Sequence, residues 1–311
     1  MKKGAIGTVI LFMTLIGLAY AEELVVVAGP HGGDLFLIGE KLSALLTDNE
    51  LTIRMAPSDG DVESIASVID GSADLAVVDS LRAYEASLGI GSLSGAKKKG
   101  LSAVAVVGLT VEHFILRGPI MDGEGITDFA DKIIYIGADG DPSRHAALAI
   151  LASVGVDSFS EAGQDWDPLT SAEMMIDGAI DGAIYSGAVP LAAVSHIASI
   201  MGDNVAFLDV PDGILAGMRK TWPVWFPFVI PEGTYQGMDE PYKTVARPIL
   251  LVAARTLDKE TIKRLLIRLF SDSNRETLLG LPYPISEPMS LTYCPIKLHP
   301  GAVEYFRQKG Y

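Results

Sequence analysis

Aspartate, serine and arginine side chains gather in four short segments of this 311-residue chain: 29–35, 58–63, 79–82 and 137–144. Each segment follows an apolar stretch and precedes residues with helical spacing. In open α/β sheets, ligands bind beyond the carboxyl ends of the strands, where helix N-termini expose free N–H groups. We therefore expect these segments to contact a small polar ligand. The residues expected to bind it are Gly32, Gly33, Asp34, Ser58, Asp61, Asp79, Ser80, Asp141, Ser143 and Arg144, together with Tyr185 near a strand end.

Motifs of catalysis and cofactor binding are missing from the sequence. The five histidines show no metal-ligand spacing, and G-x-S-x-G does not occur. The single cysteine, Cys294, has no activating context, and a small buried apolar residue is its simplest interpretation. The turn at 29–33 lacks the dinucleotide fingerprint. We therefore predict that the chain is not an enzyme and holds no resident cofactor, and we leave a bound divalent cation open.

The composition is that of a folded globular protein, with 49% hydrophobic and 20% charged residues. The formal net charge of −15 disfavours nucleic acid and anionic lipid headgroups as partners. A single cysteine cannot form an intrachain disulfide, so an oxidising compartment is tolerated rather than used.

The first 21 residues have the pattern of a signal peptide. Lys2 and Lys3 precede a mostly apolar run at 9–18, and Ala19-Tyr20-Ala21 supplies the small-x-small cleavage pattern. We predict cleavage after Ala21 and a periplasmic mature protein. The alternative is an uncleaved membrane anchor, for which the apolar run is short.

Beyond this segment, strands and helices alternate. Apolar strands are predicted at 24–28, 51–56 and 73–78, with helices beginning near Asp34 and Asp61. Such a βαβαβ order predicts a doubly wound parallel sheet.

The arrangement recurs about 107 residues later. Residues 69–76 match 176–183 at an offset of 107, and 27–29 match 135–137 at an offset of 108. We therefore predict two similar α/β lobes, with a long strand-like run at 101–117 linking them. A second strand at 244–254 would return, with Pro248 marking an edge or a bend. The predicted division is a signal peptide at 1–21, lobe I at 22–116, lobe II at 117–235, and the return to lobe I at 236–311. Two crossings of this kind permit hinge closure around a cleft.

Several motifs resemble those of the TAXI-type solute-binding proteins of TRAP transporters, over essentially the whole mature chain. The most specific is the ending at 298–306, which begins Leu298-His299-Pro300-Gly301-Ala302, and the others lie at 60–63, 71–76 and 231–237. The resemblance implies a type II periplasmic-binding-protein fold. It also implies delivery of a small ligand to the membrane subunits of an ion-gradient-driven TRAP permease, and relatives that favour organic anions such as glutamate. We expect a monomer, because no coiled coil is evident.

The loops depart from this family pattern in one direction: Asp34, Asp61, Asp79 and Asp141 stand where the family has neutral residues. An N-terminal capping aspartate occupies the amides and offsets the helix dipole that would attract an anion. Such a site suits an amine, a polyhydroxylated neutral solute, or a metal ion bridging to an anion. A zwitterion also fits, since Arg82, Arg117 and Arg144 remain. The competing interpretation is that the aspartates only cap helices and point away from the ligand.

The leading functional hypothesis is an exported solute-binding protein that serves a TRAP permease. The alternative is a periplasmic ligand sensor for a membrane signalling partner. An enzyme on the same two-lobed fold is the third, and no nucleophile–base pair in the sequence predicts it.

Overall fold

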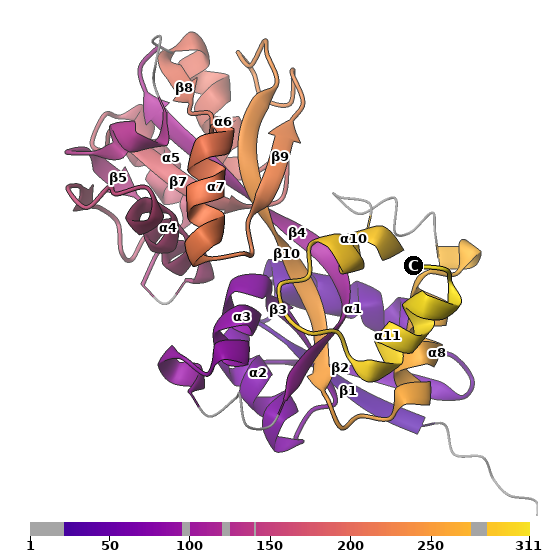
Figure 1. Ribbon diagram of the computed structural model, residues 1–311. Coiled ribbons are helices and arrows are strands. Elements are labelled where there is room, and N and C mark those ends of the chain that lie inside the picture. The colour runs from indigo at the N-terminus through magenta and orange to yellow at the C-terminus, as the bar shows by residue number, and fades with distance from the viewer. Residues whose placement is uncertain (1–21, 95–99, 120–124, 140, 275–284) are drawn as a thin grey trace, which may run out of the picture.

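The computed structural model describes residues 22–94, 100–119, 125–139, 141–274 and 285–311. The predicted signal peptide therefore lies outside the described residues. Figure 1 shows two α/β lobes, and two long strands, β4 (Leu101–Arg117) and β10 (Tyr242–Ala254), run from one lobe into the other. Within the described part of the chain, the helices are too short or too polar to cross a membrane.

Lobe I is built around β1 (Glu22–Ala28), with β2 and β3 parallel to it on either side. Strand β10 follows in the sheet, antiparallel to β3. All residues of β3 are buried, as expected where helices cover both faces of a sheet. Besides β1 and part of β10, lobe I contains α1 (Asp34–Leu46), β2 (Leu51–Pro57), α2 (Asp61–Asp70), β3 (Leu75–Asp79), α3 (Ser80–Leu88), α8 (Lys259–Leu269), α10 (Glu287–Thr292) and α11 (Pro300–Gln308), with a short 3₁₀ turn at Gly91–Leu93.

Lobe II repeats this arrangement. Strand β5 (Ile133–Tyr135) is parallel to β6 and β7, and β4 lies antiparallel to β7. The order β6-β5-β7-β4 thus corresponds to β2-β1-β3-β10 in lobe I. Besides β5 and part of β4, lobe II contains α4 (Pro142–Ser153), β6 (Ser160–Glu161), α5 (Pro168–Ile176), β7 (Gly182–Gly187), α6 (Ala192–Met201), β8 (Val205–Phe207), α7 (Asp212–Thr221) and β9 (Phe226–Ile230), with 3₁₀ turns at Ile126–Phe129 and Gly202–Asn204.

The predicted fold class is confirmed: an α/β protein of two similar doubly wound lobes, of the type II periplasmic-binding-protein class. The sequence repeat has a structural counterpart. Gly71 follows α2 and Gly178 follows α5, and both have positive φ, 86° and 78°. A left-handed residue at this point ends the helix and turns the chain into the next strand, so both lobes use the same glycine turn.

The two crossings lie within β4 and β10 rather than in loops. Strand β10 pairs with β9 over residues 242–246 and with β3 over residues 249–253, and it pairs with β4 in both lobes. Arg247 and Pro248 occupy the two positions between these partners. Pro248 therefore lies where one side of β10 has no strand partner, and a register shift follows at Ile249 and Leu250. This position suits proline, which cannot donate to a sheet ladder.

The C-terminal motif has a structural role. The buried His299 caps α11, accepting a hydrogen bond at Nδ1 from the Gly301 N–H at 3.1 Å. A Cβ at Gly301 would lie 2.5 Å from the Lys259 carbonyl oxygen, so glycine permits the close approach of α11 to α8. The core-facing side of α8 is the predicted one, with Ile262, Leu265, Leu266 and Leu269 all buried.

Candidate interlobe ligand site

Hydrogen bonds join the strand-end loops of lobe I into one cluster. The Ser58 N–H, after β2, donates to the carbonyl of Ala28 at the end of β1 over 2.9 Å. The Asp79 N–H, at the end of β3, donates to Oδ1 of Asp61, the first residue of α2, over 3.2 Å. Ser58, Asp61, Asp79 and Ser80 are all buried. Four of the residues predicted to bind ligand therefore lie together at the carboxyl edge of the lobe I sheet.

A buried arginine from the second crossing completes this cluster. Arg247 is 2% exposed, and its Nε donates to Asp79 Oδ2 over 2.7 Å while Nη1 donates to Glu112 on β4. The other oxygen of Glu112 accepts from Ser186 Oγ at 2.6 Å. The Trp225 ring lies against the guanidinium, 5.4 Å from ring centroid to Cζ, in a cation–π contact. Both crossing strands are thereby tied to the end of β3 through one guanidinium.

Asp61 differs from the other two carboxylates of the cluster, Asp79 and Glu112. Both oxygens of Asp79 and both of Glu112 have hydrogen-bond donors, whereas Asp61 Oδ2 is buried and has no donor among the described residues. Burial and the adjacent Asp79 carboxylate raise the pKa of Asp61 to about 7, against the lowering effect of the Asp79 N–H, Arg82 and Arg247.

Two further polar atoms of this region lack partners. Ser80 Oγ, on the first residue of α3, and Trp225 Nε1 are buried without a hydrogen-bond partner in the described part of the chain. Buried polar atoms are normally paired, because an unpaired group bears the full cost of desolvation. One acceptor at Asp61, one donor at Trp225 and one hydroxyl at Ser80 thus have hydrogen-bonding capacity to offer a ligand.

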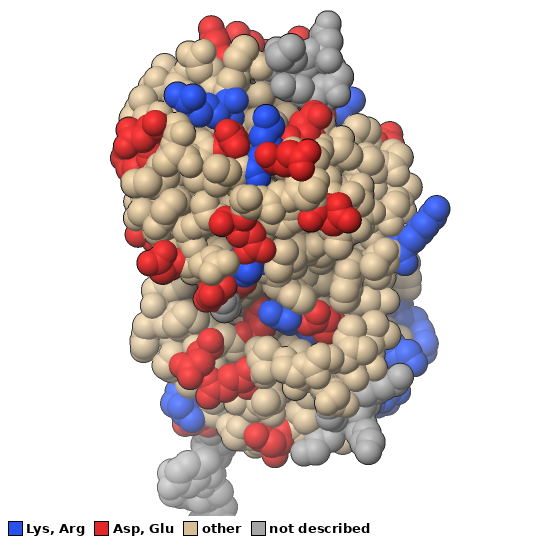
Figure 2. Space-filling model, turned by 90° about the vertical axis from the view of Figure 1, so that its left-hand side faces the viewer, with Lys and Arg blue, Asp and Glu red and all other residues tan. Residues whose placement is uncertain are grey.

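The two lobes touch beside this cluster. Glu85 on α3 of lobe I contacts His145 Nε2 on α4 of lobe II at 2.6 Å, and it accepts from Arg82 at 2.9 Å. Burial raises the pKa of Glu85, but the bonds from His145 and Arg82 outweigh it and hold that pKa below its usual range. Tyr84 meets Trp222 edge-on, with ring centroids 6.1 Å apart. Figure 2 shows charged side chains of both signs at the level where the lobes meet.

The predicted site residues of lobe II are engaged within that lobe. Asp141 caps α4, accepting from the Ser143 N–H at 2.8 Å. Arg144 forms ion pairs with Glu161 and, at 3.3 Å, with Asp139. Tyr185 is buried, and its hydroxyl lies 2.9 Å from Ser171 Oγ on α5. Two tryptophans lie at the junction, Trp222 against Tyr84 and Trp225 against Arg247, whereas Phe226 stacks on Tyr293 with ring centroids 4.2 Å apart.

The first predicted loop is exposed. Gly32 and Asp34 face solvent, and Gly33 is half-buried. The expectation that Asp34 caps α1 is wrong: Gly33 is the N-cap and Asp34 is the first helical residue, making no capping bond. Asp61 is likewise the first residue of α2 rather than its cap. Only Asp79 and Asp141 cap as expected, because only these two precede the first turn with extended backbone and reach its N–H groups.

Sequence reasoning missed Arg247, Glu112, Glu85 and His145. The sequence does contain a signal for Arg247 and Glu112, a charged residue inside a long apolar run. Arg247 is the one charge in the apolar run 244–254, and Glu112 lies in a similar run at 101–117. A lone charge inside a long buried strand requires a buried partner of opposite sign. Nothing in the sequence pointed to the contact between Glu85 and His145, which depends on how the lobes meet.

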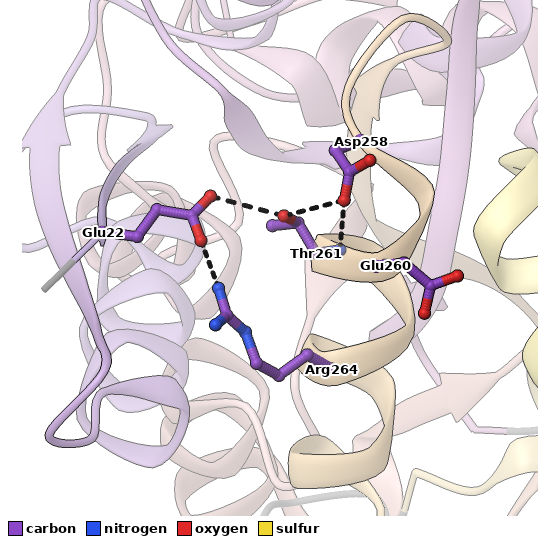
Figure 3. A pocket seen from close by; sticks show the side chains of 5 residues that line it. All are labelled: Glu22, Asp258, Glu260, Thr261 and Arg264. Atoms are coloured by element: carbon purple, nitrogen blue, oxygen red, sulfur yellow. Dashed lines mark hydrogen bonds and ion pairs between the residues drawn. The ribbon is translucent and has the colours of Figure 1, made fainter. Parts of the chain in front are cut away.

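Other polar places on the surface are less suited to a ligand. Figure 3 shows a hollow at the start of α8, where Glu22, Thr261 and Arg264 point toward one another and are paired. It lies at the amino end of β1, opposite the edge where ligands bind. A second hollow in lobe II contains the His196–Glu173 pair, 2.7 Å apart. The described residues contain no group of three or more histidine, cysteine, aspartate or glutamate side chains placed to hold a metal ion.

The fold and this junction define a two-lobed α/β protein with a polar interlobe cluster. A model described as the NMT1-like family matches residues 26–310, and the chain belongs to this family.

Solved structures with similar folds include the periplasmic sulfonate-binding protein SsuA from Methylobacillus flagellatus KT, with 14% identity over 83% of this chain and 72% of that one, at a TM-score of 0.49. The periplasmic aliphatic sulphonate binding protein SsuA from Escherichia coli is 15% identical over 93% of this chain and 84% of that one, with a TM-score of 0.43. Substrate binding domain 2 of Lactococcus lactis GlnP, in an open conformation, is 11% identical over 82% of this chain and 90% of that one, with a TM-score of 0.43. The fold class rests on the strand order described above, and not on these likenesses.

Proposed function

We propose that this protein is an exported solute-binding protein that captures a small polar solute between its lobes and delivers it to a membrane permease of the TRAP type. The observation that carries the proposal is the junction itself. Two long strands cross it, and among the described residues three buried polar atoms have no hydrogen-bond partner beside the Asp79–Arg247 pair. They belong to Asp61, which accepts from the Asp79 N–H, to Ser80, which follows Asp79, and to Trp225, whose ring packs on Arg247. A polar solute would satisfy these atoms as the lobes close on it.

Membership of the NMT1-like family and the TAXI-like motifs support the same function. The solved structures of similar fold are described as periplasmic or substrate-binding proteins, which agrees with the proposal without carrying it. Export and the periplasmic location rest on the signal-peptide pattern of residues 1–21. The choice of a TRAP permease, with its membrane subunits as partners, rests on the motifs alone.

The test begins with protein secreted by a bacterial host. N-terminal sequencing should begin at Glu22, and native mass spectrometry should find a retained small molecule. After unfolding and refolding remove that molecule, adding it back should raise the melting temperature by mass action and reduce the radius of gyration measured by small-angle X-ray scattering. Uptake into cells should require the protein, the permease genes and an ion gradient. A refolded protein that recovers no solute and never changes its radius of gyration would contradict the proposal.

A further inference from the structure

The charges of the interlobe cluster do not balance without a ligand. Arg247 is shared by two carboxylates, Asp79 and Glu112. The other nearby guanidinium, that of Arg82, pairs with Glu85 at 2.9 Å. Asp61 is thus left as the buried carboxyl with no guanidinium or ammonium bonded to it within the described residues, although it is only 3% exposed.

The hydrogen bonds of the cluster also indicate that Asp61 needs a donor from a ligand. Asp61 Oδ1 already accepts the Asp79 N–H, so the carboxyl is held in a fixed orientation with Oδ2 left over. When ionised, that oxygen can only accept, so its partner must be a donor. Ser80 Oγ is fully buried on the residue that follows Asp79, and Trp225 Nε1 belongs to the ring packed on Arg247. These two atoms are independent of the acidic groups, and they can serve a neutral or acceptor portion of the same solute.

Resting on the proposed function, we infer that the solute carries a protonated amino group, which donates to Asp61 Oδ2 and supplies the cation that the cluster lacks. A charge-assisted bond of this kind is shorter and stronger than a neutral one. A dicarboxylate would place its negative charge against Asp61, Asp79 and Glu112, while both guanidinium groups are already engaged. The protein therefore selects amines over organic dianions.

Three four-carbon compounds with matched length test this selection: putrescine with two amines, 4-aminobutyrate with one amine and one carboxylate, and succinate with two carboxylates. At pH 8, the amine-bearing compounds should raise the melting temperature of the refolded protein and bind by calorimetry, and succinate should not. In Asp61→Asn the carboxyl becomes an amide of the same shape, and amine affinity should fall at least tenfold. Asp212→Asn, at the exposed first residue of α7, should leave affinity unchanged.

A second measurement uses the unmodified protein, in case Asp61→Asn fails to fold. Amine affinity should weaken as the pH falls from 8 to 5, because Asp61, which faces Asp79, Arg82 and Arg247, takes up a proton over that range. Tighter binding of succinate than of either amine, no binding by any amine, or amine binding that is indifferent to both Asp61→Asn and pH would overturn the inference. A nitrogen-free solute retained in native mass spectrometry would also overturn it, while leaving the solute-binding function intact.

Discussion

Arg247 Nε donates a hydrogen bond to Asp79 Oδ2 over 2.7 Å, and this bond ties the second crossing strand to the end of the central strand of lobe I. The same guanidinium reaches Glu112 on the first crossing strand. One side chain therefore links three strands at the point where the lobes meet, and it does so where β10 exchanges β9 for β3. The candidate ligand site and the hinge share this residue.

Replacing Arg247 should be severely destabilising. Arg247→Met keeps the length of the side chain but leaves Asp79 and Glu112 as buried carboxylates without a counter-ion. Breaking a buried ion pair in this way costs about 3–5 kcal/mol of the free energy of unfolding, measured by urea denaturation. Arg54→Met is the control, because its ion pair with Glu23 is more than half exposed on both sides and should contribute at most about 1 kcal/mol. Equal losses in the two variants would contradict the assigned role.

Asp61 should make the protein less stable as the pH rises. Its folded pKa of about 7 exceeds the unfolded value of 3.8, so the native state binds more protons between these values. Its contribution to stability is complete below pH 4 and is lost as the pH rises through 7. Asp61→Asn should match the unmodified protein near pH 4. At pH 8 it should be more stable by at least about 1 kcal/mol, because a shift of one pKa unit corresponds to roughly that much free energy.

Denaturation midpoints across this pH range, without added solute, measure the effect of Asp61. Asp212→Asn serves again as the control and should follow the unmodified protein throughout. A difference between Asp61→Asn and the unmodified protein that stays constant from pH 4 to pH 8 would show that the Asp61 carboxyl does not titrate as described.

The contact between Glu85 and His145 should favour the closed arrangement of the lobes. Glu85→Gln removes the charge that holds α3 to α4, and the population with separated lobes should rise. Because His145 is partly exposed, we expect an effect of about 0.2–1 kcal/mol, up to about fivefold in the opening equilibrium. Distances between spin labels placed on the two lobes measure this population.

A matched control for Glu85→Gln is Glu173→Gln. That substitution alters a similar pair with His196, 2.7 Å apart, but both residues lie within lobe II. It should leave the distance distribution unchanged. If both variants open the lobes equally, the effect of Glu85→Gln does not come from a contact between lobes.

Gly137 should tolerate no side chain. Its φ is +105°, and a Cβ would lie 2.7 Å from Ser143 Oγ and 2.8 Å from the Arg144 nitrogen. Gly137→Ala should therefore cost about 1–3 kcal/mol of unfolding free energy, seen as a lower melting temperature. In Gly213→Ala, on α7, the added Cβ meets no atom of the described residues within 4 Å, and the position has no positive φ, so the substitution should be neutral or slightly stabilising. A loss in Gly213→Ala as large as that in Gly137→Ala would argue against the steric explanation.

Much of the fold could be predicted because its signals are local or repeated. The apolar strand at 24–28, the glycine turns at Gly71 and Gly178, and the offset of about 107 residues each follow from short stretches of sequence. Helix caps were harder. Whether an aspartate is the cap or the first helical residue depends on one backbone angle, and the chain puts Asp34 and Asp61 inside the helix while Asp79 and Asp141 cap.

The sequence alone predicts the α/β class, the two-lobed repeat and the nature of the polar strand-end loops, because periodicity and turn residues act over short distances. Which of those loops meet depends on tertiary packing. Tertiary packing buried Asp61 beside Asp79. It also brought Arg247, which is 168 residues from Asp79 in the sequence, into an ion pair with Asp79 and not with Asp61. It also set Glu85 against His145 across the lobes. Those outcomes depend on how crossing strands pair over long sequence separations, and no local pattern records that pairing.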